Sequence, residues 1–132
     1  LEEHNKDLQK KYELMKQDAM AEDYMIEDAE VIITAFGTTA RIAKTAIMHL
    51  RAEGKKVGLI RPITVYPFPA DHFKNLPATV RHILDVEMNC GQMIDDVKLA
   101  TECRYPVTFY GRCGGFAPSV EEVEDACRKL FA

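Results

Sequence analysis

Glu87 is the ionisable residue of this chain whose position most favours chemistry. It follows the apolar run at residues 83–86, so its carboxylate would enter a crevice at the end of a buried strand. A carboxylate in that setting can act as a general base or hold a cofactor ring, and it can equally be a local structural anchor. Its neighbours offer no second carboxylate, nucleophile or histidine that we can place beside it. We therefore predict no catalytic residue in this chain.

Glycines and arginines follow the predicted strands, and together they could bind a small anion such as a coenzyme A phosphate. Helices starting after Gly37 and at Gly91 would point free N–H groups at this edge, and Arg61 and Arg112 would add positive charge. The plainer interpretation is that the glycines only make turns and the arginines pair with Glu87 or with carboxylates of a partner, because the phosphate-loop Lys and a full G-x-G-x-x-G are absent. The candidate residues of this anion or interface edge are Gly37, Thr38, Thr39, Arg61, Glu87, Asn89, Gly91, Gln92, Gly111, Arg112, Gly114 and Gly115.

The four cysteines, Cys90, Cys103, Cys113 and Cys127, do not have metal-ligand spacing. No C-x-x-C and no nearby His pair occurs, so we predict no metal or cluster site. Cys90 and Cys113 fall on the same predicted edge, and a neighbouring Arg112 would lower a thiolate pKa, which leaves thiol redox as an alternative. A domain with this much apolar content does not need disulfides, so reduced thiols in a cytoplasm fit best.

An apolar, proline-stiffened loop follows the second predicted strand at residues 62–68. Its prolines prevent a continuing ladder or helix, so some side chains must fold back onto the domain. The others would form a rigid apolar patch, which on many proteins marks an interface. Interface and core remain open alternatives, and the candidate interface residues are Pro62, Tyr66, Pro67, Phe68 and Pro69.

Short apolar runs alternate with amphipathic helical segments from residue 30 onward. Buried strands are predicted at residues 31–36, 57–60, 83–86 and 107–110. Helices are predicted from a Thr38 or Thr39 cap to Gly54, over residues 71–76, from Gly91, and from Ser119, where Glu122 completes a capping box. This alternation predicts an α/β fold, a three-layer α/β/α sandwich around a mainly parallel sheet. An antiparallel edge strand also fits around residues 24–26.

The chain has 132 residues, of which 47% are hydrophobic, enough for one domain with one core. Residues 1–21 carry a thin helical stripe, Leu8, Tyr12, Met15 and Ala19, which predicts a linker helix from a missing upstream domain; residues 22–132 form the domain. The first 30 residues hold ten acidic residues against four Lys, which argues against a nucleic-acid arm. No apolar run approaches the roughly 20 residues that a membrane span requires. Without an initiator Met, the chain looks cut from a longer polypeptide.

Taken together, several short motifs resemble the α-subunit of bacterial and archaeal 2-oxoacid:ferredoxin oxidoreductases, most closely the 2-ketoisovalerate branch. The motifs are residues 27–37, Arg41-Ile42, residues 54–58, Arg61-Pro62, residues 67–69, Val86-Glu87 with Asn89, residues 91–93, Asp96-Val97, Gly111-Arg112 and Gly114-Gly115. The likeness covers nearly the whole chain. The front helix also resembles the segment that joins a thiamine-pyrophosphate-fold domain to this one.

The resemblance implies a transketolase C-terminal-like fold and a mechanism divided among domains. In such oligomeric complexes thiamine diphosphate with Mg decarboxylates the 2-oxoacid, iron–sulfur clusters carry electrons to ferredoxin, and coenzyme A takes the acyl group. This chain has no G-D-G motif and no cluster-type cysteine runs. The resemblance therefore implies an inactive assembly domain without a cofactor of its own. Its partners would be the other domains of its subunit and the beta and gamma subunits, with ferredoxin reached through the complex, in the cytoplasm and away from nucleic acid and membrane.

Overall fold

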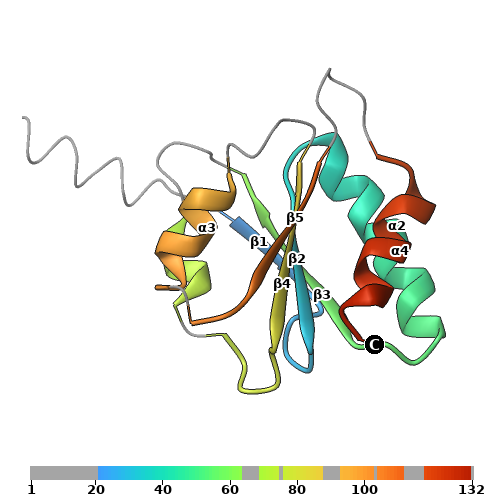
Figure 1. Cartoon of the computed structure of the whole chain (residues 1–132), viewed down its shortest axis with the longest axis horizontal. Coiled ribbons are helices and arrows are strands. Elements are labelled where there is room, and N and C mark those ends of the chain that lie inside the picture. The colour runs from blue at the N-terminus through green and yellow to red at the C-terminus, as the bar shows by residue number, and fades with distance from the viewer. Residues whose placement is uncertain are drawn as a thin grey trace, which may run out of the picture.

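The structure, a computed structural model, describes residues 21–63, 69–74, 76–87, 93–102, 104–111 and 118–131. They form a central sheet with helices on both faces (Figure 1). The elements are β1 (Ala21–Tyr24), β2 (Val31–Thr34), α2 (Thr38–Ala52), β3 (Val57–Pro62), the short 3₁₀ helix η1 (Ala70–Phe73), β4 (His82–Glu87), α3 (Ile94–Ala100), β5 (Val107–Gly111) and α4 (Val120–Lys129). The predicted three-layer α/β architecture is confirmed.

The sheet has the strand order β1-β3-β2-β4-β5. β3, β2, β4 and β5 run parallel, and β1 pairs with β3 in the antiparallel direction, with Ala21 opposite Pro62 and Tyr24 opposite Leu59. The predicted antiparallel edge strand is therefore present, but it lies at Ala21–Tyr24 rather than at residues 24–26. Ala21, which we placed at the end of the linker helix, opens this strand; residues 1–20 lie outside the described residues, so the linker helix stays a prediction.

Two apolar cores lie on opposite faces of the sheet. α2 and α4 cover one face, where Ile33, Ile47, Leu50, Leu59, Leu84 and Val123 are fully buried. η1 and α3 cover the other face, where Ile32, Ile60, Phe73, Ile83, Met93 and Val97 are buried. All four residues of β2 are buried because this central strand is covered on both faces, which explains its continuous β-branched sequence.

Glycines with positive φ angles lie just before and just after α2. Gly37 is its N-cap with φ 63°, and no side chain caps the helix, so the predicted Thr38 or Thr39 cap is wrong. Both threonines already lie within the first turn, where their side chains are past the capping position. Gly54, with φ 87°, donates its N–H to Arg51 O at 3.0 Å and closes the helix as predicted.

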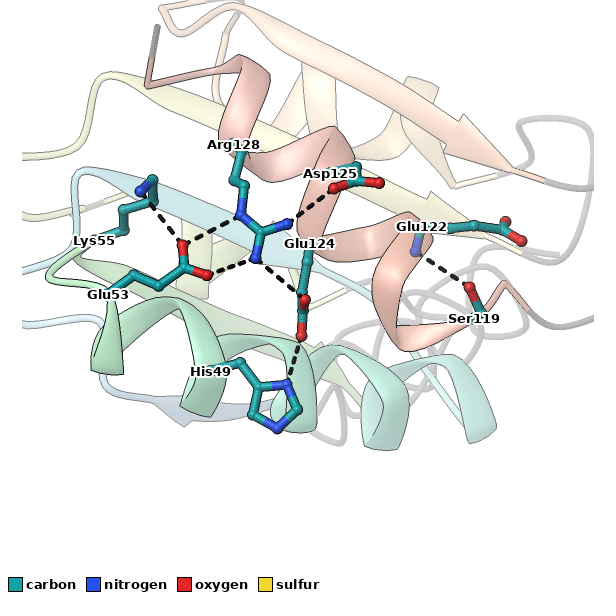
Figure 2. Close-up of polar contacts among 8 residues, drawn as sticks. All are labelled: His49, Glu53, Lys55, Ser119, Glu122, Glu124, Asp125 and Arg128. Atoms are coloured by element: carbon teal, nitrogen blue, oxygen red, sulfur yellow. Dashed lines mark hydrogen bonds and ion pairs between the residues drawn. The ribbon is translucent and has the colours of Figure 1, made fainter.

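The remaining helices follow the predicted pattern with shifted starts. α3 begins at Ile94, three residues later than predicted, and Gly91 itself lies outside the described residues. The helix expected at residues 71–76 is the single 3₁₀ turn η1. α4 begins where predicted, because the N–H of Glu122 donates to Ser119 Oγ at 3.2 Å (Figure 2).

An ion-pair network joins α2 to α4 at the outer surface (Figure 2). The Arg128 guanidinium donates to both carboxylate oxygens of Glu53, at 2.5 and 3.2 Å, and to Asp125 at 2.8 Å. Glu124 accepts from Arg128 at 3.3 Å, and its other oxygen lies 2.5 Å from His49 Nδ1. Because Glu53 accepts these hydrogen bonds, its pKa falls from 4.5 to about 2.

Candidate functional site

The strand order creates one position where a ligand crevice is expected. β2 continues into α2 on one face of the sheet, and its parallel neighbour β4 continues toward α3 on the other face. The chain therefore diverges beyond the carboxyl ends of β2 and β4, and open α/β sheets bind ligands at such a switch point. This position coincides with the edge that the sequence predicted.

The β2 side of this edge presents the start of α2. Gly37 and Thr38 are exposed, whereas Thr39 is buried. The first turn of α2 contains no acidic residue and has no side-chain cap, so its free N–H groups face the edge with the positive end of the helix dipole. This half of the site suits an anion or a hydrogen-bond acceptor from a partner.

Arg61, which we expected to bind an anion or to pair with Glu87, lies beside a different carboxylate. Its Nη1 lies 3.7 Å from Glu22 Oε2, and the other carboxylate oxygen of Glu22 accepts from Lys44 Nζ at 3.0 Å. The arginine therefore pairs with β1 rather than with Glu87. These pairs are partly exposed and bridge β1, β3 and α2, as expected of a surface network that holds an edge strand in place.

The β4 side of the edge is acidic and buried. Glu87, only 1% exposed, accepts a hydrogen bond at Oε1 from the backbone N–H of Met93 at 2.7 Å, which fixes the chain just before α3. Asp85 lies two positions earlier on the same face of β4 and is fully buried. The structure thus corrects our expectation that no second carboxylate accompanies Glu87. A charged residue two positions before Glu87 in a strand covered on both faces was the signal that we missed.

The two buried carboxyl groups cannot both carry a charge at neutral pH. Burial first, and then the neighbouring Glu87 carboxylate, together raise the pKa of Asp85 from 3.8 to about 9. Asp85 is therefore protonated and uncharged at neutral pH. Burial first, and then Asp95 and Glu87, also raise the pKa of Asp96 on α3.

This arrangement can anchor the start of α3 and hold a proton, but it is a poor site for an anionic cofactor. A diphosphate beside Asp85 and Glu87 would face a buried negative charge. Across the part of the chain that the structure describes, no three His, Cys, Asp or Glu side chains gather closely enough to hold a metal ion. Cys127 is a free, buried thiol whose pKa burial raises to about 12, so it is not a reactive cysteine.

The other predicted site residues divide into two groups. Gly111 ends β5 at the same sheet edge. Pro62 is buried as the last residue of β3, Pro69 is buried at the start of η1, and Ile63 between them is 51% exposed. The rest lie outside the described residues, so their roles stay predictions; they are Asn89, Gly91, Gln92, Arg112, Gly114, Gly115, Tyr66, Pro67 and Phe68, with Cys90 and Cys113 of the thiol alternative.

A known protein family matches most of this chain. The family described as pyruvate:ferredoxin oxidoreductase core domain II covers residues 29–123, which spans the sheet from just before β2 into α4. The chain belongs to this family. The predicted resemblance to 2-oxoacid:ferredoxin oxidoreductases is thereby confirmed.

Curated relatives of this core domain II are subunits of such enzymes. The chain is 42% identical over 131 residues to the ketoisovalerate oxidoreductase subunit VorB of Methanothermobacter marburgensis, covering 98% of this chain and 36% of that subunit. It is 38% identical over 99 residues to the 2-oxoglutarate synthase subunit KorA of Methanocaldococcus jannaschii, covering 75% of this chain and 26% of that one. The chain therefore spans about a third of the length of the curated relatives that it matches, or less.

Two solved structures share the fold of this core domain II. The 2-oxoglutarate:ferredoxin oxidoreductase of Magnetococcus marinus, solved with 2-oxoglutarate, coenzyme A and succinyl-CoA bound, matches with a TM-score of 0.75 and 25% identity over 86% of this chain and 20% of its own. A split-gene transketolase, solved as an inactive beta4 tetramer, matches with a TM-score of 0.67 over 83% of this chain and 40% of its own. At 18% identity the second match shows the fold alone, and it agrees with the transketolase C-terminal-like prediction.

Proposed function

We propose that this chain is a non-catalytic assembly domain of a thiamine-diphosphate-dependent 2-oxoacid:ferredoxin oxidoreductase. The observation that carries the proposal is the alignment with VorB, which covers 98% of this chain but only 36% of that subunit. The parent enzyme would oxidatively decarboxylate a 2-oxoacid to an acyl-CoA and reduce ferredoxin, and the branched-chain 2-oxoacids are the first substrates to test. This domain would hold the parts of the complex together.

The residues described here do not fit the cofactors of the parent reaction. Thiamine diphosphate needs a bound metal and a cationic or neutral cradle for its diphosphate, whereas the β4 side of the switch point carries the buried Asp85–Glu87 pair. Thiamine diphosphate, Mg and the iron–sulfur clusters would therefore be bound by other domains or subunits. This domain would supply neither a catalytic residue nor a cofactor to the reaction.

The carboxyl edge of the sheet and the loop after β3 are the surfaces that we assign to the neighbouring thiamine-binding part or subunit. Gly37 and Thr38 are exposed at the uncapped start of α2, where backbone N–H groups would donate hydrogen bonds to a carbonyl or carboxylate of a partner. Ile63, 51% exposed just after β3, supports an apolar contact beside it. Partners would be the other domains of the same subunit and the beta and gamma subunits, with ferredoxin reached through the complex.

We also place the complex in the cytoplasm. The free thiol of Cys127 fits a reducing compartment. Within the described residues, none of the helices combines the length and the apolar composition that crossing a bilayer requires.

Reconstitution tests the proposal. The remaining part of a parent subunit and its partner subunits would be purified without this domain and then mixed with the purified chain. We expect the chain to copurify with them and to restore 2-oxoacid-dependent reduction of a viologen dye. Failure of the chain to bind any of these parts would contradict the assembly role.

A second candidate function is the binding of a small anion, such as a 2-oxoacid carboxylate or a coenzyme A phosphate, at the start of α2. Two observations favour it: the first turn of α2 is uncapped and free of acidic residues, and the related 2-oxoglutarate enzyme was solved with coenzyme A bound. Thermal-shift titration tests it with coenzyme A and with 3-methyl-2-oxobutanoate. Ligand binding to the folded state would raise the melting temperature with concentration, and an unchanged value at millimolar ligand would exclude this function.

A further inference from the structure

The two open edges of the sheet differ in charge. β1, at one edge, has Glu22 and Asp23 as its middle residues, and both are exposed. Exposed charges discourage an edge strand from pairing with another chain. β5, at the other edge, has the sequence Val-Thr-Phe-Tyr-Gly, without a charged residue or a proline, and within the described residues it pairs with β4 alone. Among the residues that the structure describes, β5 thus carries neither a charge nor a proline that would protect an open edge.

The hydrogen-bonding groups at this open edge can be assigned from the β4–β5 ladder. Pro106 O accepts from the N–H of Ile83 at 3.0 Å, so the backbone of residue 106 faces β4. In a parallel ladder, alternate residues direct their backbone groups to the same neighbour, and those between them point the other way. The residues whose N–H and C=O groups point outward are therefore Val107, Phe109 and Gly111.

A groove of about 380 Å³ lies beside this edge, between β5 and α4. Thr108, Phe109 and Tyr110 line it from the strand, and Asp125 and Lys129 are among the residues that line it from the helix. Phe109 is 37% exposed, which is unusual for a phenylalanine in a sheet. The backbone groups of β5 that point outward can pair with a strand from another chain. The exposed Phe109 and the groove beside it favour such a strand over water at this edge.

We propose that β5 forms an interface between two copies of this chain, in which the two β5 strands pair antiparallel about a twofold axis at Phe109. The inference goes beyond the proposed function, which concerns contacts with other parts of the complex. In this register Phe109 faces Phe109 and Val107 faces Gly111, so every outward N–H and C=O meets a partner. The aromatic pair and the uncharged neighbours make the strand complementary to itself. The same pairing at β1 would bring Glu22 opposite Asp23.

Charge on α4 also fits a second copy. A twofold axis perpendicular to the sheet keeps both α4 helices on the same face of the joined sheet and makes them antiparallel. The early part of α4 is acidic and its end is basic, with Glu121, Glu122 and Asp125 followed by Arg128 and Lys129. Asp125 of one copy would then approach Lys129 of the other across the paired strands, so the two helices attract rather than repel.

Sedimentation equilibrium of the purified chain over about 1–100 µM tests the interface, since weak dimers have dissociation constants in that range. We expect a monomer–dimer equilibrium in the wild type. Phe109→Lys places two ammonium groups opposite each other and should raise the dimer dissociation constant at least about tenfold. The control Met48→Lys changes an exposed apolar residue of α2, 61% exposed, and should leave that constant unchanged. Circular dichroism would verify that both variants are folded.

A charge reversal on α4 provides a second measurement that does not touch the strand. Lys129→Asp should weaken the dimer about two- to fivefold, and Lys129→Arg, which keeps the charge, should leave the wild-type value unchanged. A wild-type chain that stays monomeric at all concentrations would overturn the interface, and so would a dimer that Phe109→Lys leaves intact. Neither result bears on the assembly role, because reconstitution with the parent subunits measures that separately.

Discussion

The carboxyl group of Asp85 lies beside that of Glu87 on one face of β4, with both side chains buried. Glu87 holds the N–H of Met93 at 2.7 Å, so this pair connects the central strand β4 to the start of α3. Because burial disfavours the charged form of Asp85 and the neighbouring Glu87 carboxylate adds to this effect, Asp85 stays protonated at neutral pH. The folded protein therefore binds a proton that its unfolded chain releases.

Because the folded state holds this proton, we expect the free energy of unfolding to fall as the pH rises. The pKa of Asp85 is about 9 in the folded state and 3.8 in the unfolded chain, so between these values the folded state binds more protons. The free energy of unfolding should then decrease from about pH 4 towards pH 9, by at most about 1.4 kcal/mol per pH unit. Urea unfolding at pH 5, 6.5 and 8 measures this slope.

Asp85→Asn should flatten the same profile, because the amide has nearly the shape of the protonated carboxyl group but does not titrate. Glu121→Gln, at an exposed position of α4, is the control and should keep the wild-type slope. An Asp85→Asn variant with the full wild-type pH dependence would show that Asp85 does not hold this proton.

Gly58 allows a close backbone approach near the start of β3. A Cβ atom there would lie 2.7 Å from Met25 O and 2.9 Å from Ile26 Cα, and these backbone atoms cannot rotate away. Gly58→Ala should therefore lower the free energy of unfolding by about 1–3 kcal/mol, measured by urea denaturation. Gly54→Asn should cost clearly less, because no atom lies within 4 Å and Asn tolerates the left-handed angle. Equal losses in both variants would contradict the packing argument.

Ser119 satisfies one of the free N–H groups at the start of α4, at 3.2 Å from Glu122 N. Ser119→Ala should destabilise the chain by about 1 kcal/mol, read from the shift of the thermal unfolding midpoint. Thr45→Ala is the control, because its hydroxyl only donates back to Arg41 O within α2, at 3.3 Å, and this bond adds little to helix stability. A cap variant as stable as the control would mean that solvent replaces the Ser119 oxygen without cost.

Arg128 joins α4 to α2 through both carboxylate oxygens of Glu53. Arg128→Lys should lower the unfolding midpoint, because an ammonium cannot make the two-pronged contact, and the loss should shrink in 1 M salt as the Debye length falls to about 3 Å. The pKa of Glu53 is about 2 in the folded state, so the effect should be complete above pH 4.5 and disappear as the pH falls towards 2.

Arg81→Lys is the matched control for this network. Its guanidinium lies 3.6 Å from Glu30 and is 68% exposed, so the same substitution there should change the unfolding midpoint little. If Arg81→Lys and Arg128→Lys had the same effect, the helix–helix network would contribute nothing specific.

Much of the fold could be predicted because single segments carry its signals. The β-branched run at Val31–Thr34 identifies a strand covered on both faces, and Ser119 with Glu122 marks the start of α4. The starts of α2 and α3 were less predictable. Gly37, with a positive φ angle, is the N-cap of α2, although the next residue, Thr38, is of a type that often caps helices. The position of the cap depends on the path of the chain from β2 into α2, which the sequence does not show.

The candidate site was predictable as a location but not in its chemistry. The carboxyl ends of parallel strands share one edge, so Gly37 and Glu87 were expected near each other, whereas the ion pair of Arg61 with Glu22 depends on the strand order. Asp85 was not predicted as a partner of Glu87, because it stands between Leu84 and Val86 in an otherwise apolar segment. Its alternation with Glu87 on one face was the available signal.

The measurement that tests the central claim most directly is turnover by the purified chain alone. The assay would supply 3-methyl-2-oxobutanoate or 2-oxoglutarate with thiamine diphosphate, magnesium, coenzyme A and an oxidised viologen dye. We predict no 2-oxoacid-dependent dye reduction until the rest of the parent complex is added. Dye reduction by the chain by itself would contradict the claim that its role is assembly.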